Sequence, residues 1–352
     1  MRYAVLWTLM LLTALCGAPA FARGQAAHKT AHASVLTLDP VYLRGDGAIM
    51  TFTSGTLIDP YFPTKALLVA QDNGMDISLL ALPWIDWMLA HQDINGLFSR
   101  YCFKPGETTY ENCAVADADD AMMAMWVELL YRMAPKSGMP DAWKLSIDKC
   151  LYQLDTLFNR ETGVFNISKS MQVGLLMDNI EIYSAFKRVE RESVRIGDGK
   201  GSLTFRHRAD YIRLGIMGRF WDNKNKRFIA STQDRREMSF YPDTVAQLIP
   251  MMHHFIIPQI PSYSVFYKQW MKHHRDEWFA LIGNDYPWGL LAVYAADRGD
   301  EKTAHCWLQQ AAPYRNSNVW NVLDETAFQI VGMKVKRKPF DIDQECLEDK
   351  AL

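Results

Sequence analysis

Apolar side chains recur at intervals of three and four residues along most of this chain. From Asp119 onward, for example, Met122, Met123, Trp126 and Leu130 keep this spacing, which places them on one face of a helix. Short stretches rich in Gly, Asn, Asp and Pro interrupt the pattern and mark turns. The pattern predicts an all-α chain with no convincing series of strands and with helices over residues 62–73, 76–91, 118–134, 140–158, 172–191, 203–221, 241–256, 262–281, 286–298, 300–312 and 321–332.

Three of the turns are similar to one another. Residues 92–98, 159–165 and 222–228 are polar stretches that end in a phenylalanine, and these phenylalanines are 67 and 63 residues apart. That period equals about two helices with their connections, and a fixed period indicates a repeated structural unit. We therefore expect a series of helical hairpins.

Acidic residues stand beside aromatic ones at six helix starts. The markers Asp59, Asp119, Asp178, Asp243, Asp285 and Asp324 are separated by steps of 60, 59, 65, 42 and 39 residues. Six markers predict six hairpins in a single domain. If alternate helices form an inner ring, all six starts lie at one end of it, where carboxylates and aromatic rings gather at one mouth.

This layout resembles the six-hairpin, (α/α)6-toroid carbohydrate enzymes, which include glycoside hydrolases, polysaccharide lyases and sugar epimerases. The resemblance is carried by Ala116-Asp117-Ala118-Asp119-Asp120 before a Met- and Trp-rich helix, by the repeated turns, and by residues 240–248. The resemblance covers about residues 40–332 at the level of layout. It does not place the chain in one known family. It implies an all-α (α/α)6 toroid whose acids lie at the starts of inner helices and face an open cleft.

Glycoside hydrolysis uses one carboxylic acid to protonate the leaving oxygen and one carboxylate to activate water or attack the sugar. Asp117 and Asp120 have an alternative role at the helix start, where capping and the helix dipole favour acids. Capping leaves Asp119 unexplained, so Asp119 is the first candidate for the general acid. Asp178 and Asp243 are the candidates for the base.

Sugars stack on aromatic rings, and polar groups fix their hydroxyls. The candidates to bind substrate stand at the predicted inner-helix starts; they are Tyr61, Asp120, Tyr241, Asp285, Tyr286, Trp288 and Trp320. Several acids also have structural alternatives: Asp243 can stabilise a helix dipole, Asp285 can cap a helix, and Glu181 can pair with Lys187 or Arg188 on the outer surface. Arg100 and Arg235-Arg236 suit either an acidic sugar or solvated surface.

The first 22 residues have the features of a secretory signal. Arg2 precedes an apolar run from Val5 to Cys16, and Ala20-Phe21-Ala22 fits a cleavage site after Ala22. A lipoprotein cut before Cys16 is the alternative. We expect residues 23–36 to be a disordered lead-in, residues 37–333 to be the toroid and residues 334–352 to be a charged tail. No later apolar run is long enough to cross a membrane.

The net charge and the cysteines narrow the possible functional classes of the protein. Without Arg2 the chain has 37 Lys and Arg against 40 Asp and Glu, which is too neutral for electrostatic binding of nucleic acid. In an oxidising compartment Cys102 and Cys113 can close a loop, which leaves an odd number of cysteines, and Cys150 is expected to be a buried apolar residue. The spacing of His and Cys suggests no metal site, and no cofactor is implied.

The leading interpretation is an exported glycoside hydrolase, periplasmic or secreted, that cleaves a polysaccharide or oligosaccharide by carboxylate general acid/base catalysis. An inverting mechanism is suggested by the resemblance alone. One alternative is a polysaccharide lyase, for which Tyr241, Tyr286 and His207 are the obvious suppliers of a base. Another is a non-catalytic glycan-binding or scaffold protein of an exopolysaccharide secretion system.

Overall fold

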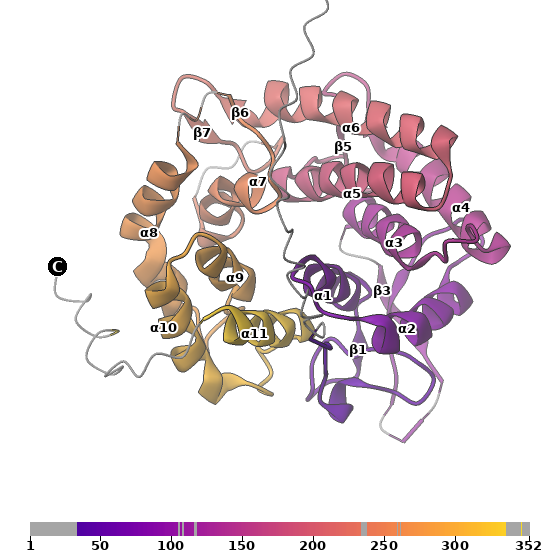
Figure 1. Cartoon of the computed structure of the whole chain (residues 1–352), viewed down its shortest axis with the longest axis horizontal. Coiled ribbons are helices and arrows are strands. Elements are labelled where there is room, and N and C mark those ends of the chain that lie inside the picture. Colours follow the sequence, from indigo (N-terminus) through magenta and orange to yellow (C-terminus); the bar gives the residue numbers. More distant parts are fainter. Residues whose placement is uncertain are drawn as a thin grey trace, which may run out of the picture. The chain divides into compact units, whose positions relative to one another are not determined.

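Two concentric layers of helices form a ring (Figure 1). The computed structural model describes residues 34–335 except 105, 108, 116, 117, 234–237, 259 and 261, together with Cys346. The inner layer consists of α1 (Tyr61–Asp72), α3 (Asp119–Met133), α5 (Leu176–Arg195), α7 (Ile249–Met252), α9 (Gly289–Asp297) and α11 (Val322–Lys334). The outer layer consists of α2 (Ser78–His91), α4 (Asp141–Leu157), α6 (Gly199–Phe220), α8 (Tyr263–Ala280) and α10 (Glu301–Ala311).

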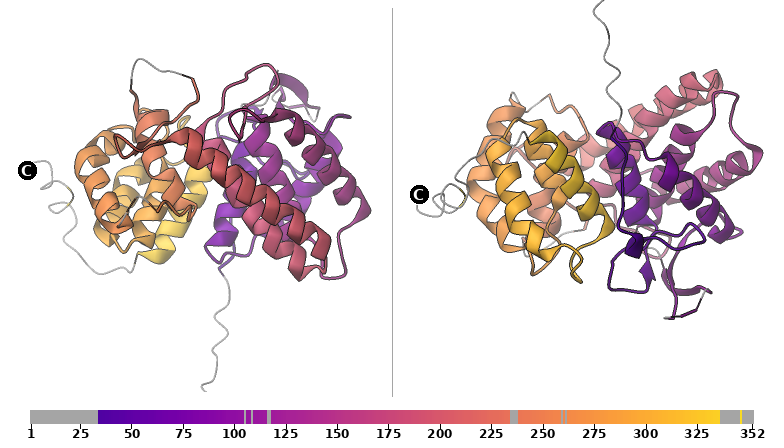
Figure 2. Two further views of the ribbon diagram at one scale, coloured as in Figure 1. Left: turned by 90° about the horizontal axis from the view of Figure 1, so that it is seen from above. Right: turned by 60° about the horizontal axis from the view of Figure 1, so that its bottom comes forward.

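The chain alternates between the two layers. Each of the first five inner helices is followed by an outer one, and the pairs α3–α4, α5–α6 and α9–α10 pack against each other, as the two further views also show (Figure 2). The last inner helix, α11, packs against both α9 and α1 and so closes the ring. Within the described residues no outer helix follows α11. The predicted all-α (α/α)6 toroid in a single domain is confirmed.

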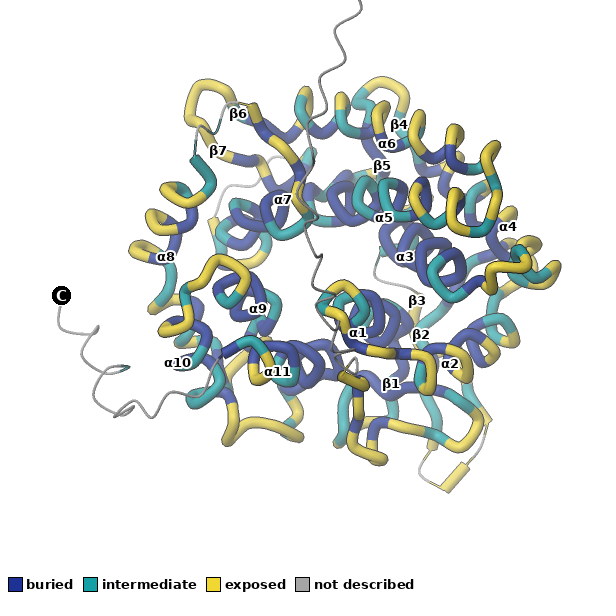
Figure 3. The backbone as a smooth tube through the Cα atoms, viewed as in Figure 1, coloured by how far each residue is buried: buried dark blue, intermediate teal, exposed yellow. Residues whose placement is uncertain are grey.

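Burial differs between the layers for a simple geometric reason. An inner helix is covered both by its outer partner and by the opposite side of the ring, and every residue of α3 from Asp120 to Tyr131 is buried. An outer helix is covered on one face only, and in α4 the buried residues are Ser146, Ile147, Cys150, Gln153, Leu154 and Leu157. Figure 3 shows this contrast around the whole ring. The helical spacing of apolar residues in the sequence comes from these outer helices and from the starts of the inner ones.

The repeated turns have one backbone feature in common. Gly96, Gly163 and Lys226 each stand two residues before the phenylalanine that ends their turn, and each has a positive φ, of 94°, 72° and 53°. Glycine suits this conformation because it has no Cβ. At Gly163 the chain also passes so close to α6 that a Cβ on Gly215 would lie 1.8 Å from the Gly163 carbonyl oxygen.

Short strands flank these turns, which corrects the expectation that strands are absent. β4 (Phe158–Asn159) pairs with β5 (Val164–Phe165), and β6 (Trp221–Asp222) pairs with β7 (Arg227–Phe228). In each case a side-chain amide from the next inner segment holds the phenylalanine backbone. Asn179 bonds the N–H and the carbonyl of Phe165, and Gln247 does the same at Phe228. A separate sheet joins β1 (Leu57–Ile58), β2 (Ser99–Cys102) and β3 (Glu111–Val115).

One predicted helix is wrong. Residues 241–256 form an irregular turn at Phe240–Thr244, a 3-10 turn at Val245–Gln247 and the four residues of α7. Tyr241, directly before Pro242, has an extended backbone, and Pro250 lies in the first turn of α7, where its missing N–H costs no helix hydrogen bond, so the chain starts a new short helix there. Two further 3-10 turns are present. One, Ala312–Tyr314, follows α10, and the other, Pro40–Tyr42, precedes β1.

The cysteines behave as expected and add one bond. Cys102 and Cys113 form the predicted disulfide, and Cys150 is a buried free thiol. A second disulfide joins Cys306 of α10 to Cys346. The predicted signal, residues 23–33 and most of the tail lie outside the described residues, whereas Leu36 of the predicted lead-in is buried in the core. None of the helices described is long and apolar enough to cross a membrane.

Candidate functional site

A cavity of about 530 Å³ lies at one end of the inner ring, and its volume is within the range of small-ligand sites. Each inner helix contributes to its wall from its first turn or from the residues just before it; examples are Tyr61, Ala118, Asp178, Val245, Trp288 and Asp324. The expected gathering of the helix starts at one mouth is therefore confirmed. The N-terminal ends of helices carry partial positive charge, which favours carboxylates at this position.

Asp59 is one of the cavity carboxylates and is paired with a cation. Its Oδ2 accepts a hydrogen bond of 2.6 Å from Nε of Arg100, and its Oδ1 accepts one of 3.1 Å from the N–H of Tyr61. Arg100 belongs to β2, which the Cys102–Cys113 disulfide ties to β3. Arg100 therefore lines the cavity, in contrast to the solvated position that the sequence offered as its alternative.

Asp324 is a cavity carboxyl that burial keeps protonated near neutral pH. Its Oδ1 accepts a 2.9 Å bond from the N–H of Gly289, and its Oδ2 accepts a 2.6 Å bond from Nδ2 of Asn321. These bonds lower its pKa, but burial outweighs them and raises the pKa of Asp324 to about 7. Gly289 is required for this approach, because a Cβ there would lie 3.1 Å from Oδ1 and 2.6 Å from the nearest side chain.

Asp178 and Asp120 form a carboxyl pair at the starts of α5 and α3. Asp178 lines the cavity, while Asp120 is fully buried. Neither carboxyl oxygen of Asp120 has a hydrogen-bond partner among the residues that the structure describes. Burial and the neighbouring Asp178 raise the pKa of Asp120 well above its usual value. The protonated form of Asp120 is therefore favoured, which spares Asp178 a second negative charge beside it.

A buried ion pair forms the floor of the cavity. Lys65 of α1 pairs with Glu181 of α5, and the two side chains are only 4% and 1% exposed. The Lys65 ammonium also donates to the Tyr61 hydroxyl at 3.0 Å, and that hydroxyl donates to Glu181 at 2.9 Å. Burial lowers the pKa of Lys65 to about 7, whereas the negative charge of Asp178 raises it. The expected surface pairing of Glu181 with Lys187 or Arg188 is wrong, since Glu181 points into the ring.

The ion pair is also close to an imidazole. Burial, and in second place the charge of Lys65, lower the pKa of His253 to about 3, so His253 is neutral at physiological pH.

Aromatic rings also contribute to the cavity wall. Tyr61, Tyr241, Tyr286 and Trp288 all line the cavity. Tyr241 and Trp288 lie with ring centroids 5.2 Å apart, and Tyr241 and Tyr286 keep 42% and 40% of their surface exposed. Trp288 has a φ of 50° and so turns the chain just before α9. The structure thus brings together four of the five aromatic candidates.

Two of the three acids chosen from the sequence as catalytic lie away from the cavity wall. Asp119 is half-buried, and burial together with Asp93 raises its pKa to about 6. Asp93 belongs to the turn after the outer helix α2, so Asp119 lies near that turn. Asp243 accepts bonds from the N–H and the hydroxyl of Ser239, at 3.0 and 3.4 Å, and so closes the turn before α7. Of the predicted catalytic acids, Asp178 lines the cavity.

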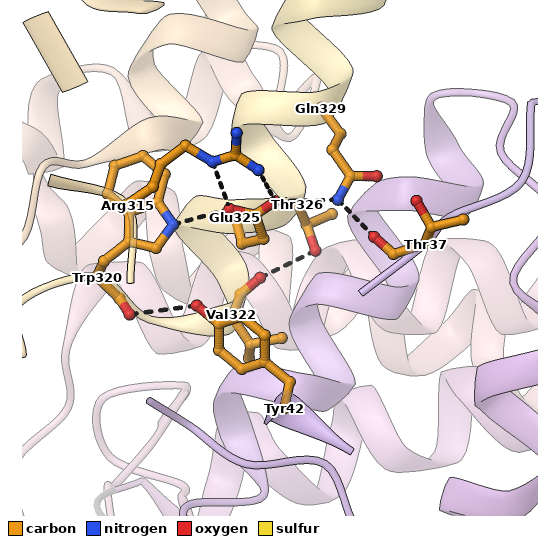
Figure 4. Close-up of polar contacts among 8 residues, drawn as sticks. All are labelled: Thr37, Tyr42, Arg315, Trp320, Val322, Glu325, Thr326 and Gln329. Atoms are coloured by element: carbon orange, nitrogen blue, oxygen red, sulfur yellow. Dashed lines mark hydrogen bonds and ion pairs between the residues drawn. The ribbon is translucent and has the colours of Figure 1, made fainter. Parts of the chain in front are cut away.

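Three predicted substrate-binding residues also lie off the cavity wall: the buried Asp120 described above, Asp285 and Trp320. Asp285 is exposed and accepts a bond from the N–H of Tyr286. Trp320 is fully buried in the core, stacked on Trp307 with centroids 5.9 Å apart, and its indole N–H donates to Glu325. Figure 4 shows it in a network in which Arg315 also binds Glu325 and Tyr42 donates to the Trp320 carbonyl. This network links the chain before β1 to α11.

Lys65, Asp59 and Asp324 were not chosen from the sequence as site residues. Asp59 and Asp324 stand among the six markers of helix starts, and this regularity was the signal that could have found them. Lys65 was detectable as a lysine one turn after Tyr61 and directly before the apolar run Ala66–Ala70. Asp117 and Arg235-Arg236 lie outside the described residues. Over the described part of the chain, no group of three or more His, Cys, Asp or Glu side chains is placed to hold a metal ion.

Comparison with known proteins supports the fold. No protein-family model and no curated protein matches the sequence. The structure is similar to that of a novel alpha-amylase from Clostridium perfringens, with a TM-score of 0.53 and 11% identity over 84% of this chain and 94% of that one. This similarity shows that the chain shares the toroid fold of a carbohydrate-active enzyme.

Two further structures are less similar. A GH78 family rhamnosidase of Bacillus sp. GL1 has a TM-score of 0.43 and 10% identity, over 77% of this chain and 31% of that one. A sugar epimerase from a ruminal bacterium has a TM-score of 0.39 and 11% identity, over 81% of this chain and 74% of that one.

Proposed function

We propose that this protein is an exported glycoside hydrolase whose active site is the cavity at the starts of the inner helices. The observation that carries the proposal is that two carboxyl groups in unequal surroundings, one of them with a pKa raised by burial, meet in one aromatic-lined cavity. Asp324 and Asp178 both line it, and Asp324 holds its proton up to a pH of about 7. Hydrolysis of a glycosidic bond requires such an unequal pair.

In this proposal Asp324 is the general acid. Its raised pKa lets it protonate the leaving oxygen at neutral pH, and its bonds to Gly289 and Asn321 hold the carboxyl still. The acid thereby moves from Asp119 to Asp324, because Asp119 lies towards Asp93 rather than on the cavity wall.

Asp178 is proposed as the base or nucleophile. It lines the cavity, and the raised pKa of the neighbouring Asp120 favours leaving the negative charge of the pair on Asp178. The rings of Tyr241, Tyr286 and Trp288 would stack on the sugar faces. The cavity volume suits a short oligosaccharide or a few units of a longer chain.

Export is supported by two observations. The first 22 residues have the features of a signal peptide, and two disulfides tie the described part of the chain together. Disulfides persist mainly in oxidising compartments. We therefore assign the mature protein to the periplasm or the exterior, where polysaccharides are the available substrates.

The experiment is a screen of the purified mature protein against a broad panel of polysaccharides and oligosaccharides, with reducing ends as the readout. On a substrate that is cut, Asp324→Asn and Asp178→Asn should each lose about 10²- to 10⁴-fold in kcat/KM. Asp285→Asn is the matched control, because Asp285 stands at an inner-helix start but is exposed and off the cavity wall. Circular dichroism spectra should show all three variants folded.

Asp119→Asn decides between the two assignments of the acid. Loss of activity in Asp119→Asn together with full activity in Asp324→Asn would return the acid to Asp119. Products that carry a new carbon–carbon double bond would identify a lyase instead.

A specific observation favours a second candidate function, non-catalytic glycan binding. Asp59 is paired with Arg100, and both oxygens of Asp324 accept hydrogen bonds within the protein, so each has a structural role besides a chemical one. A protein that binds a glycan from the panel in calorimetry and cuts none of them would be such a binding protein. A place in an exopolysaccharide secretion system would then be the natural role.

A further inference from the structure

The floor of the cavity holds a cation whose hydrogen bonds are incompletely used. Lys65 lines the cavity although its side chain is only 4% exposed. As an ammonium it has three N–H donors. Among the residues described, two acceptors are present, the Tyr61 hydroxyl and one oxygen of Glu181. The third donor is available to an oxygen atom of a molecule in the cavity.

The geometry around Lys65 holds this donor in place. Tyr61 and Lys65 are one turn apart on α1, and Glu181 faces them from α5. The Tyr61 hydroxyl bonds both charged groups, so the three side chains form a closed triangle. A donor held by two partners loses little further freedom when a ligand binds.

The same triangle has no net charge. The ammonium of Lys65 is balanced by Glu181, whichever of the two holds the proton. Arg100, the other cation described on the cavity wall, is balanced by Asp59. Asp178 adds a further carboxylate to the wall. A carboxylate group on a sugar would thus meet cations that already have partners, and it would be repelled by Asp178.

We propose that Lys65 is a specificity-determining residue that donates its third N–H to a hydroxyl of an uncharged sugar unit, and that Glu181 excludes uronic acids by neutralising this cation. The inference rests on the proposed function and names its substrate class, which is a neutral glycan. It assigns Glu181 a role in selection and none in bond cleavage.

The first experiment uses the wild-type protein and needs no variant. A glycan array that contains neutral oligosaccharides and uronate-bearing ones of matched length should give hits among the neutral members. Calorimetry on the best neutral hit and its uronate counterpart should show at least about tenfold tighter binding of the neutral one, the difference that a buried polar mismatch produces.

Two variants then test the residues. Lys65→Met should weaken binding of the neutral hit by about tenfold or more, because a hydrogen bond from a charged donor is lost. Glu181→Gln leaves Lys65 without its counter-charge, and a ligand carboxylate can take that place, so the preference for the neutral glycan should fall by about tenfold. The matched controls are Lys144→Met and Glu161→Gln on the exposed surface, which should change neither affinity.

The outcomes separate this inference from the proposed function. If wild-type protein binds the uronate glycan as tightly as the neutral one, or if Glu181→Gln leaves the preference unchanged, the inference is overturned while a hydrolase of acidic glycans remains. If the protein binds no glycan of either class, both proposals fall. Should both variants prove unfolded by circular dichroism, the wild-type comparison alone decides.

Discussion

Replacing Lys65 by methionine should destabilise the protein by about 3–5 kcal/mol, the usual cost of removing one partner of a buried ion pair. Methionine keeps the length of the side chain, so the loss comes from the charge. Glu181 is 2% exposed, and its Oε2 has no hydrogen-bond partner within the described structure. After the substitution the Tyr61 hydroxyl would be the donor left, among the described residues, to a carboxyl sealed from water.

The variant should respond to pH in a defined direction. Without its cation, Glu181 would take up a proton in the folded state that the unfolded chain releases at neutral pH. The folded variant then binds more protons than the unfolded one, so its stability falls as pH rises. The loss relative to wild type should accordingly be smaller at pH 5 than at pH 7.

The double variant Lys65→Met/Glu181→Leu supplies the decisive comparison. It removes both charges, and replacing a buried pair by apolar groups is often neutral or stabilising. We expect it to be more stable than Lys65→Met by about 3 kcal/mol or more. The assay is urea unfolding followed by tryptophan fluorescence and far-ultraviolet circular dichroism, with ΔG extrapolated to zero urea.

An ion pair on the surface provides the comparison for the loss of stability in Lys65→Met. Lys187→Met breaks the ion pair with Glu190, in which the lysine side chain is 37% exposed, and should cost less than about 1 kcal/mol. The reasoning is refuted if Lys65→Met also costs less than about 1 kcal/mol, or if the double variant is no more stable than Lys65→Met.

Activity on a confirmed substrate should fall as pH rises through about 7, where burial puts the pKa of Asp324; a profile still flat at alkaline pH contradicts its role as acid. Gly289→Ala should cost about 1–3 kcal/mol in urea unfolding, because its Cβ would lie 2.6 Å from a neighbouring side chain, whereas Gly332→Ala in open space should cost nothing. Tyr286→Ala should weaken glycan binding in calorimetry by about 1 kcal/mol, while Tyr152→Ala on the outer surface leaves it unchanged.

Much of the fold could be predicted because its signals are local. The spacing of apolar residues reflects which face of a helix packs against its neighbours, and ten of the eleven predicted ranges coincide with helices of the structure. The polar turns predicted the period of the hairpins, and the short Cys102–Cys113 loop predicted its disulfide. The predicted helix over 241–256 failed because Tyr241, the residue before Pro242, is extended and because Pro250 starts a new short helix, α7.

The sequence predicted the position of the candidate site better than it predicted the residues that form the site. Six acid-marked helix starts do surround one cavity, yet Asp119 lies off its wall while Asp324 lies on it. Neighbouring residues on a helix point about 100° apart, so a small rotation of the helix decides which of them faces the ring. That rotation is set by packing against α1, α4 and α5, which no local pattern contains.

By itself, the sequence determined the helices, their pairing in hairpins and the end of the ring at which acids and aromatic rings collect, because these depend on periodicity and on short turns. Only the tertiary structure decided which side chains from different helices contact one another. Lys65 and Glu181 are 116 residues apart, and they meet because closure of the ring brings α1 and α5 together. The same closure buries Trp320 in the core and raises the pKa of Asp324, since both effects arise from atoms that distant helices contribute.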